Sequence, residues 1–287
     1  MSAVNARLAT QGEVLLACEG VGKRFGGVRA LEDVSFAIRR GEIYGLIGPN
    51  GAGKTTLFNL LTGIYAPDSG RFTFDGAGLD GLKPHQVTLR GIARTFQNIR
   101  LFANLSALEN VMIGRHARTR AGVIGAVLRN RATRDEEARI EARAMELLTF
   151  VGIASRADDA AGSLPYGDQR RLEIARALAT DPKLIALDEP AAGMNATESR
   201  ALAALVRNVR ELGITVLLIE HDMKLVMSLC DRLLVLDHGE RVLEGEPAEV
   251  QSDARVIDAY LGVALPESGV AVDDTPRGEA PAQGARP

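Results

Sequence analysis

Cysteine is scarce in this sequence and long apolar runs are missing. The two cysteines, Cys18 and Cys230, stand apart without the close spacing of a metal site, so we expect two reduced thiols in a reducing compartment. No basic segment followed by an apolar core occurs near the N-terminus, which argues against a secretory signal. The longest apolar stretches, such as residues 121–128, are too short to cross a bilayer. A role at a membrane would therefore require another subunit.

No strong charge imbalance marks the chain, whose formal net charge of −3 gives no reason to expect nucleic acid as a partner. The hydrophobic fraction of 46% and the charged fraction of 25% are ordinary for a globular protein, and 287 residues can bury a full core. Between residues 114 and 134, six arginines occur without an acidic residue. This segment is either a solvated surface insertion or a contact for anionic lipid head groups.

The most informative stretch is residues 48–55, which match the G-x-x-x-x-G-K-[ST] phosphate loop. An apolar run at 43–47 predicts a strand before it, and Leu57, Leu60 and Leu61 follow at helical spacing. In such a loop, backbone N–H groups converge on phosphates, Lys54 reaches the outer phosphates and Thr55 ligates Mg²⁺. The residues assigned to the nucleotide are Gly48, Pro49, Asn50, Gly51, Ala52, Gly53, Lys54, Thr55 and Thr56.

Strand and helix patterns alternate in the second half of the chain, with strands expected at 183–187, 214–219 and 233–236 and helices at 197–212 and 222–230. This alternation predicts an α/β fold with a mainly parallel core sheet. Short strands before residue 75 predict an antiparallel β subdomain, and helical character from about 89 to 179 predicts an inserted helical subdomain. We expect a flexible tail at 1–11, a folded domain at 12–262 and a disordered tail at 263–287.

Acidic and neutral polar residues after the expected strands supply the remaining chemistry. Asp188 and Glu189 follow an apolar strand, where Asp188 can hold the Mg²⁺ shell and Glu189 can act as the general base on water. His221 also follows a strand, and open α/β sheets bind ligands at the carboxyl ends of their strands. Gln97 is a neutral amide that can sense Mg²⁺ or water. The helix expected to begin near Gly167 offers a second anion site at its N-terminus.

In combination, these motifs resemble the ATP-binding subunits of ABC transporters, from about residue 15 to residue 261. Residues 48–55 look like the Walker A loop, Gln97 like the Q-loop glutamine, residues 184–189 like the Walker B strand with its catalytic glutamate, and His221 like the switch histidine. Phe25 is similar to the aromatic residue that stacks on adenine. The resemblance implies ATP as substrate, with Lys54, Glu189 and His221 catalytic and with Thr55, Gln97 and Asp188 on Mg²⁺. The signature motif, which serves a partner subunit's ATP, is matched by Leu164, Pro165, Tyr166, Gly167, Asp168 and Gln169.

The motifs resemble the branched-chain amino-acid importers in particular, and the longer of their two non-identical ATPase subunits. Residues 94–97, 166–176, 190–195, 220–227 and 257–262 carry this likeness. It implies a second ATPase subunit, with a homodimer as the alternative in isolation. It also implies two membrane permease subunits contacted near residues 97–102, a periplasmic solute-binding protein, and a place at the cytoplasmic face of the inner membrane through the permeases.

Two departures from the general family pattern lead to a hypothesis. Pro165 and Tyr166 stand where the signature normally has serine and glycine, and Asn195 replaces the acid that ends the D-loop. Losing one charge-assisted contact to phosphate costs about 1.5–3 kcal/mol unless backbone N–H groups compensate. We therefore expect two unequal ATP sites, with slower turnover at the one that Pro165 completes.

Three alternatives to branched-chain amino-acid import remain at this stage. The same subunit type could power an importer of urea, other amides or another small solute. A soluble ABC ATPase of DNA repair or translation would be expected to show a second cassette, zinc cysteines or a coiled-coil arm. A P-loop GTPase or small-molecule kinase would leave the helix at Gly167 and His221 unexplained, and the Asn-Lys-x-Asp guanine signature is missing.

Overall fold

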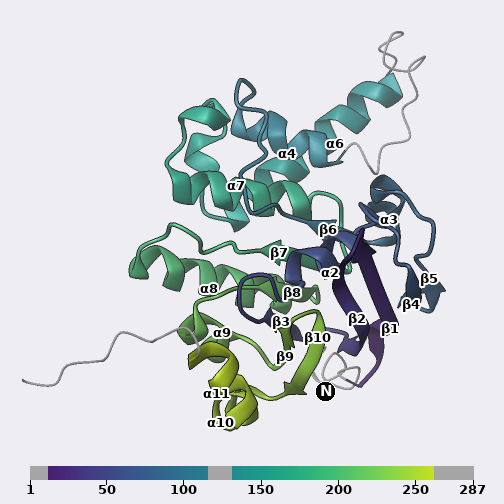
Figure 1. The fold of residues 1–287 in the computed structure, drawn as a ribbon. Helices are drawn as coiled ribbons and strands as arrows, with labels where there is room; N and C mark the ends of the chain where they lie inside the picture. The colour runs from purple at the N-terminus through teal and green to yellow at the C-terminus, as the bar shows by residue number, and fades with distance from the viewer. Residues whose placement is uncertain (1–11, 116–130, 262–287) are drawn as a thin grey trace, which may run out of the picture.

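The computed structural model describes residues 12–115 and 131–261. The tails expected at 1–11 and 263–287 lie outside the described residues, and so do residues 116–130 of the arginine-rich segment. The chain forms two sheets, with helices above and to one side of them (Figure 1).

The core is a six-stranded sheet in the order β10-β9-β3-β8-β7-β6. The five strands from β9 to β6 run parallel, and only β10 pairs in the antiparallel sense, with β9. The mainly parallel sheet predicted from the sequence is therefore confirmed. Its strands are β3 (Ile43–Ile47), β6 (Ile92–Arg94), β7 (Leu184–Asp188), β8 (Thr215–Ile219), β9 (Arg232–Asp237) and β10 (Glu240–Gly245).

The second sheet is antiparallel and comes from the N-terminal part of the chain, in the order β2-β1-β4-β5. A hairpin joins β4 to β5, and its two turn residues, Asp75 and Gly76, both have positive φ, 52° and 74°, as a tight type I′ turn requires. This sheet is the antiparallel β subdomain that the sequence predicted. Its strands are β1 (Val14–Phe25), β2 (Val28–Arg39), β4 (Ser69–Phe74) and β5 (Ala77–Gly78).

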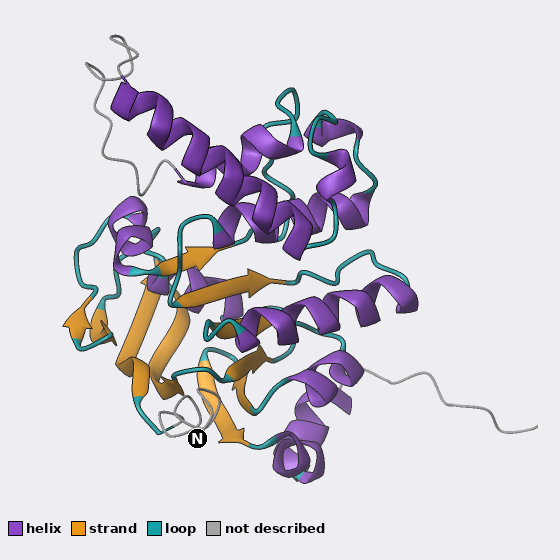
Figure 2. Cartoon of the chain, turned by 180° about the vertical axis from the view of Figure 1, so that it is seen from behind, coloured by secondary structure: helices purple, strands orange, loops and turns teal. Residues whose placement is uncertain are grey.

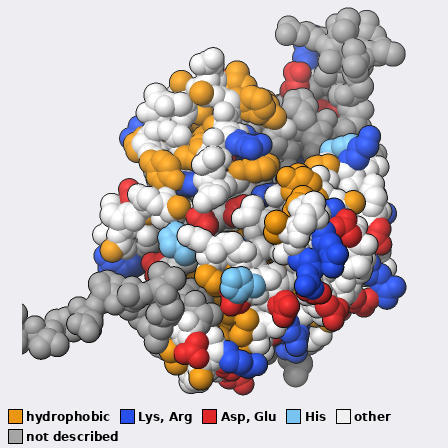
Figure 3. All heavy atoms as spheres, in the orientation of Figure 1, with side chains coloured by type: hydrophobic (Ala, Val, Ile, Leu, Met, Phe, Trp, Pro, Cys, Tyr) orange, Lys and Arg blue, Asp and Glu red, His pale blue; other side chains and the backbone are white. Residues whose placement is uncertain are grey.

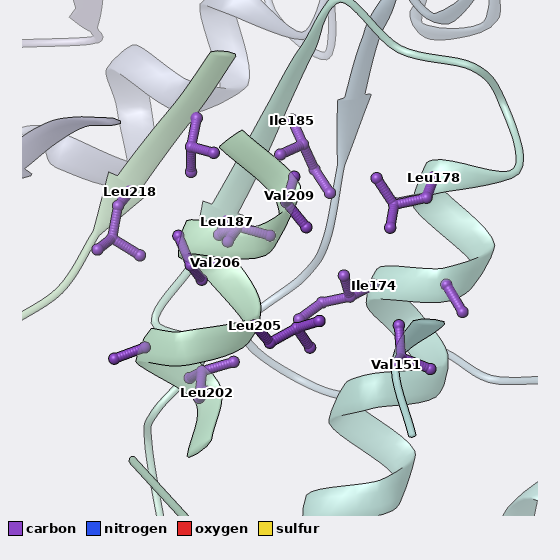
Figure 4. Packing of buried hydrophobic residues seen from close by; sticks show 14 of the residues in the cluster. Val151, Ile174, Leu178, Ile185, Leu187, Leu202, Leu205, Val206, Val209 and Leu218 are labelled. Atoms are coloured by element: carbon purple, nitrogen blue, oxygen red, sulfur yellow. The ribbon is translucent and has the colours of Figure 1, made fainter. Parts of the chain in front are cut away.

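Alternate residues of each central strand face two different cores, which is why these strands read as continuous apolar runs. On β8, Val216 and Leu218 join a core with helices α7 (Tyr166–Leu178) and α8 (Ala196–Glu211). Leu217 and Ile219 join a second core, with helix α2 (Lys54–Leu61) and the antiparallel sheet. Figure 4 shows the first of these cores, where Leu205 and Val206 approach the sheet and Ile174. Both faces of the sheet are covered, so it is held rigidly at the centre of the molecule.

Helices cover the parallel sheet along its length (Figure 2). α8 shows why: its leucines and valines at helical spacing, including Leu202, Leu205 and Val209, are buried, and its polar residues face solvent. The helices that accompany the sheet are α2 (Lys54–Leu61), α3 (Pro84–Arg90), α8 (Ala196–Glu211), α9 (Met223–Leu229), α10 (Pro247–Ser252) and α11 (Ala254–Leu261).

The inserted helical region contains α4 (Ala107–Arg115), α6 (Arg131–Phe150) and α7 (Tyr166–Leu178), which lie together at the top of Figure 1. The range expected to be helical, 89–179, also contains β6, which pairs with β7 at the edge of the core sheet. A strand of three residues is too short to show a pattern of its own, so the sequence did not reveal it. Among the described residues, no helix has the length and apolar character needed to span a bilayer.

Candidate functional site

The sheet order places four sequence motifs next to one another. β3, β8, β7 and β6 are neighbours and parallel, so their carboxyl ends lie along one edge. The phosphate loop follows β3, His221 follows β8, Asp188 ends β7 and Gln97 follows β6. Polar residues scattered over more than 170 positions of sequence are thereby gathered at the edge where open α/β sheets bind ligands.

The phosphate loop is tightly wedged between β3 and α2. A side chain at Gly48, whose φ is 150°, would collide with the carbonyl of Leu236. A Cβ atom at Gly53, whose φ is 99°, would lie 2.6 Å from the carbonyl oxygen of Ala30. Only glycine satisfies both the backbone conformation and the close approach at these two positions.

Lys54 opens α2 directly after the loop and is only 8% exposed. Its ammonium donates to the carbonyls of Gly48 at 2.6 Å and Pro49 at 2.9 Å. Burial lowers the pKa of Lys54, and the nearby carboxylates of Glu189 and Asp188 oppose that shift. A desolvated ammonium beside a helix N-terminus that has no side-chain cap forms a strongly anion-attracting corner.

Asp188 is buried at the end of β7 and pairs with Arg94, whose Nη2 lies 3.1 Å from the Asp188 Oδ2. Burial raises the pKa of Asp188 and the ion pair with Arg94 opposes the shift. Arg94 also donates to Asn59 on α2 at 2.7 Å and to Thr62, the residue that caps the end of α2, at 3.0 Å. Arg94 was not predicted as a site residue, because its partners lie far away in the sequence.

Glu189 stands at the centre of the gathered residues. Its φ of 45° places a non-glycine residue in the left-handed region, a costly conformation that is enriched at functional sites. Its carboxylate accepts from Gln97 Nε2 at 2.8 Å, and the Nδ1 atom of His221 lies 3.8 Å from the same oxygen. The structure thus brings together three of the residues singled out in the sequence.

Glu220 is a further acidic residue that sequence reasoning missed. It precedes His221, is 1% exposed, and accepts from the backbone N–H of Ala191 at 2.7 Å. Burial raises the pKa of Glu220, while the Ala191 hydrogen bond opposes that shift. Ala191 belongs to the segment 190–195, called the D-loop below, so Glu220 joins the D-loop to the end of β8. Asn195 ends the D-loop and caps α8 through hydrogen bonds from Thr197 and Glu198.

The signature segment, residues 164–169, lies at the start of α7, as expected, with Pro165 as the N-cap residue. Pro165 offers its carbonyl to the N–H groups of Asp168 and Gln169, and Gln169 Nε2 donates to the carbonyl of Leu164. Within the described residues, no hydrogen bond or ion pair joins this segment to the phosphate loop of the same chain. The structure therefore does not bring these two predicted binding elements together.

Phe25 ends β1 and is partly exposed. Its ring meets Tyr65 edge to face, with centroids 5.3 Å apart, and the Lys23 ammonium lies 5.6 Å from its centroid. Tyr65 was not predicted from the sequence. The two rings provide an exposed aromatic surface on which a flat base can stack.

Thr55, Gln97 and Asp188 suit a magnesium ion by donor type. A hydroxyl, an amide oxygen and a carboxylate are hard oxygen ligands, and Mg²⁺ is usually held by one or two carboxylates together with substrate phosphates. Gln97 donates to Glu189 through its amide nitrogen, so this hydrogen bond does not use its amide oxygen. Among the described residues, no cluster of three or more His, Cys, Asp or Glu side chains forms a metal cage. Thr55, Gln97 and Asp188 supply only one carboxylate, so a magnesium ion held by them would need phosphate oxygens of the nucleotide as further ligands.

Comparison with known proteins extends these observations. Residues 31–192 match the ABC transporter family model, and residues 241–265 match that of the branched-chain amino acid ATP-binding cassette transporter. The chain is 44% identical over 251 residues to the high-affinity branched-chain amino acid transport ATP-binding protein LivG of Salmonella typhimurium, covering 87% of this chain and 98% of that protein.

Solved structures show the same likeness. The ADP conformation of an ATP-binding cassette of an ABC transporter is 33% identical, with a TM-score of 0.76, over 87% of this chain and 99% of that chain. A dimeric, post-hydrolysis ATP-binding cassette bound to ADP and Pi is 26% identical, with a TM-score of 0.69, over 81% of this chain and 99% of that chain.

Proposed function

The chain belongs to the ABC transporter family, and we propose that it is the ATP-hydrolysing subunit of a branched-chain amino-acid importer. The observation that carries the proposal is the grouping of Lys54, Gln97, Asp188, Glu189 and His221 at the carboxyl ends of four adjacent parallel strands. The name of the Salmonella relative and the match at residues 241–265 support the solute class.

The chemistry assigned to these residues is attack of water on the γ-phosphate of ATP. Glu189 takes the proton from water as the general base, and Gln97 holds its carboxylate in position through the 2.8 Å hydrogen bond. The Lys54 ammonium turns from its loop carbonyls to the phosphate oxygens and offsets their charge. His221, about two-thirds exposed at its side chain, is placed to contact the γ-phosphate from the edge of the site.

Magnesium supplies Lewis-acid neutralisation of the phosphate oxygens when it is bound. Thr55, Gln97 and Asp188 are the residues assigned to hold it, by the donor chemistry described above. Asp188 would contribute its carboxylate to such an ion, and in the structure this carboxylate pairs with Arg94. Arg94 has further acceptors in Asn59 and Thr62.

A second ATPase subunit completes the site. Among the described residues, no hydrogen bond or ion pair joins the signature segment at the start of α7 to the phosphate loop of its own chain, so its anion-attracting helix end is available to a neighbour's ATP. The dimeric cassette bound to ADP and Pi is a precedent for such pairing in a related protein. A non-identical homologue is the partner we assign, with a homodimer as the form in isolation.

The permease subunits are assigned to a groove beside residues 96–102, called the glutamine loop below. This groove holds about 210 Å³. Its apolar lining includes Ala93, Phe102, Ile113 and Ala177, and its charged lining is Arg94, Glu173 and Arg176. Phe102 is 50% exposed. Hydrophobic side chains gather over the helical region above, whereas charged ones are mixed over the antiparallel sheet (Figure 3). Docking here would hold the chain at the cytoplasmic face of the inner membrane.

Purification of the membrane complex that contains this chain tests the proposal. We expect a periplasmic solute-binding protein to accompany it and to stimulate ATP hydrolysis when loaded with leucine, isoleucine or valine. Stimulation by urea or another amide, and not by these amino acids, would assign the subunit to a different importer. A complex without ATP hydrolysis would contradict the enzymatic part of the proposal.

A further inference from the structure

The hydroxyl of Tyr166 is a junction between three segments. It donates to the carbonyl of Ala192 in the D-loop at 3.0 Å, and it accepts from Arg170 Nε at 3.2 Å and Nη2 at 2.8 Å. A tyrosine hydroxyl has one proton to donate and lone pairs to accept with, so its hydrogen-bonding capacity is in use. The phenol ring also lies against Gly193, where a Cβ atom would be 3.6 Å from Cε1. Tyr166 thus ties the start of α7 to the D-loop.

Arg170 continues the connection toward the glutamine loop. Its side chain is buried, with 3% of the residue exposed, and it donates to the carbonyls of Phe96 at 2.9 Å and Gln97. It also contacts Glu173 at 3.3 Å. All five N–H groups of the guanidinium therefore have acceptors. A fully satisfied, buried fork of this kind fixes the relative position of the groups it joins.

Two more residues of α7 hold the same loop. Glu173 accepts from the N–H of Arg100 at 2.8 Å, and Arg176 donates to the carbonyl of Arg100 at 2.6 Å. The glutamine loop is therefore bound to α7 by side chains on successive turns. A displacement of this loop must carry the N-terminal part of α7, and with it the Tyr166 hydroxyl.

We propose that Tyr166 and Arg170 are positioning residues that transmit movement of the glutamine loop to the D-loop during ATP hydrolysis. The inference rests on the proposed function, because it assigns the permease to the glutamine loop. The D-loop begins at Pro190, the residue after Glu189. Within the D-loop, the N–H of Ala191 donates to the Glu220 carboxylate. A shift of Ala192 therefore moves the backbone that carries the general base. Tyr166, at a position where the family pattern has glycine, supplies a rigid link that glycine lacks.

The test compares the rate of ATP hydrolysis in the reconstituted membrane complex with that of the ATPase subunits alone. In Tyr166→Phe, which removes only the hydroxyl, we expect the ratio of these rates to fall at least about fivefold. KM for ATP should stay within about twofold of the wild type, because the hydroxyl is engaged with Ala192 and Arg170 of its own chain and the rest of the signature segment is kept. Arg170→Lys removes the guanidinium group that joins Tyr166 to the glutamine loop, and we expect it to lower the ratio of rates as well. The double variant should show no further fall, because the two residues act in one chain of contacts.

Tyr44→Phe is the matched control. It also removes a tyrosine hydroxyl that donates a hydrogen bond, in this case to the Glu244 carboxylate at 2.9 Å, but Tyr44 lies at the start of β3, whereas the phosphate loop follows its end. It should lower the unfolding temperature without changing the ratio of rates. An unchanged ratio in Tyr166→Phe, a raised KM with an unchanged ratio, or a fall in Tyr166→Phe that Arg170→Lys does not share would overturn the relay. Absence of hydrolysis in the wild-type complex would instead overturn the proposed function.

Discussion

Replacement of Glu189 by glutamine isolates the proposed general base with little change in shape. In the structure, the Glu189 carboxylate accepts from Gln97 at 2.8 Å and lies 3.8 Å from Nδ1 of His221. A glutamine can keep an oxygen toward Gln97, but its amide cannot take a proton from water. The change therefore removes the base while the phosphate loop and Lys54 stay in place.

The expected size of the effect follows from the role of the residue. A positioned general base contributes about 10²–10⁴ in rate, or roughly 2.7–5.4 kcal/mol of barrier. The affinity for ATP should stay the same or rise, because Glu189→Gln removes a negative charge beside the phosphates. Two like charges about 5 Å apart repel by roughly 3 kcal/mol at an effective dielectric constant near 20.

Two assays check these expectations on the purified chain. Phosphate release should fall at least about 100-fold in Glu189→Gln, and equilibrium binding of ATP should be as tight as in the wild type or tighter. Glu211→Gln is the control, because it makes the same change at an exposed residue at the end of α8. Hydrolysis by Glu189→Gln at a rate within about tenfold of the wild type would refute the assignment of the base.

Three further changes give independent expectations. Pro165→Ser restores a hydroxyl at the N-cap of α7 and should speed the slower of two unequal sites by roughly tenfold or more, measured as single-site turnover in the complex; no change would argue against unequal sites. Asn195→Ala removes two capping hydrogen bonds of α8 and should lower the free energy of unfolding by about 0.5–2 kcal/mol in urea titrations; an unaltered midpoint would exclude the cap. Glu220→Gln removes a carboxyl whose burial raises its pKa, so the folded wild type binds more protons than the unfolded chain above the ordinary value of 4.5 and loses stability as pH rises. The variant should therefore gain stability relative to the wild type as pH rises through that range, and a constant difference would contradict this.

Motifs that depend on local sequence were predicted well. The strand, glycine loop and helix around residues 43–61 show their pattern within one stretch, and the alternation after residue 183 specifies buried parallel strands. The α/β fold with an antiparallel subdomain and inserted helices followed from these patterns and is confirmed by the related solved structures. The edge position of Asp188 and His221 followed because Asp188 ends one apolar strand and His221 follows another.

Contacts that depend on tertiary packing were not predicted. Arg94 is separated by 94 residues from its partner Asp188, and Arg170 by 73 residues from the Gln97 carbonyl. Nothing in the local pattern marks Glu220 as a buried acceptor for Ala191. Tyr166 was predicted as part of the signature segment and noted as a departure from the family pattern, but its contact with the D-loop was not predicted. That contact is set by how α7 packs beside residues 192 and 193.

The central claim is that the site around Lys54 works only when a second subunit adds the start of its α7. The most direct measurement is ATP hydrolysis by the purified chain across a dilution series, with the oligomeric state followed at each point. We predict that the rate per molecule rises with protein concentration and follows the dimer population. Full hydrolysis by a strictly monomeric chain, at a rate per molecule independent of concentration, would contradict the claim.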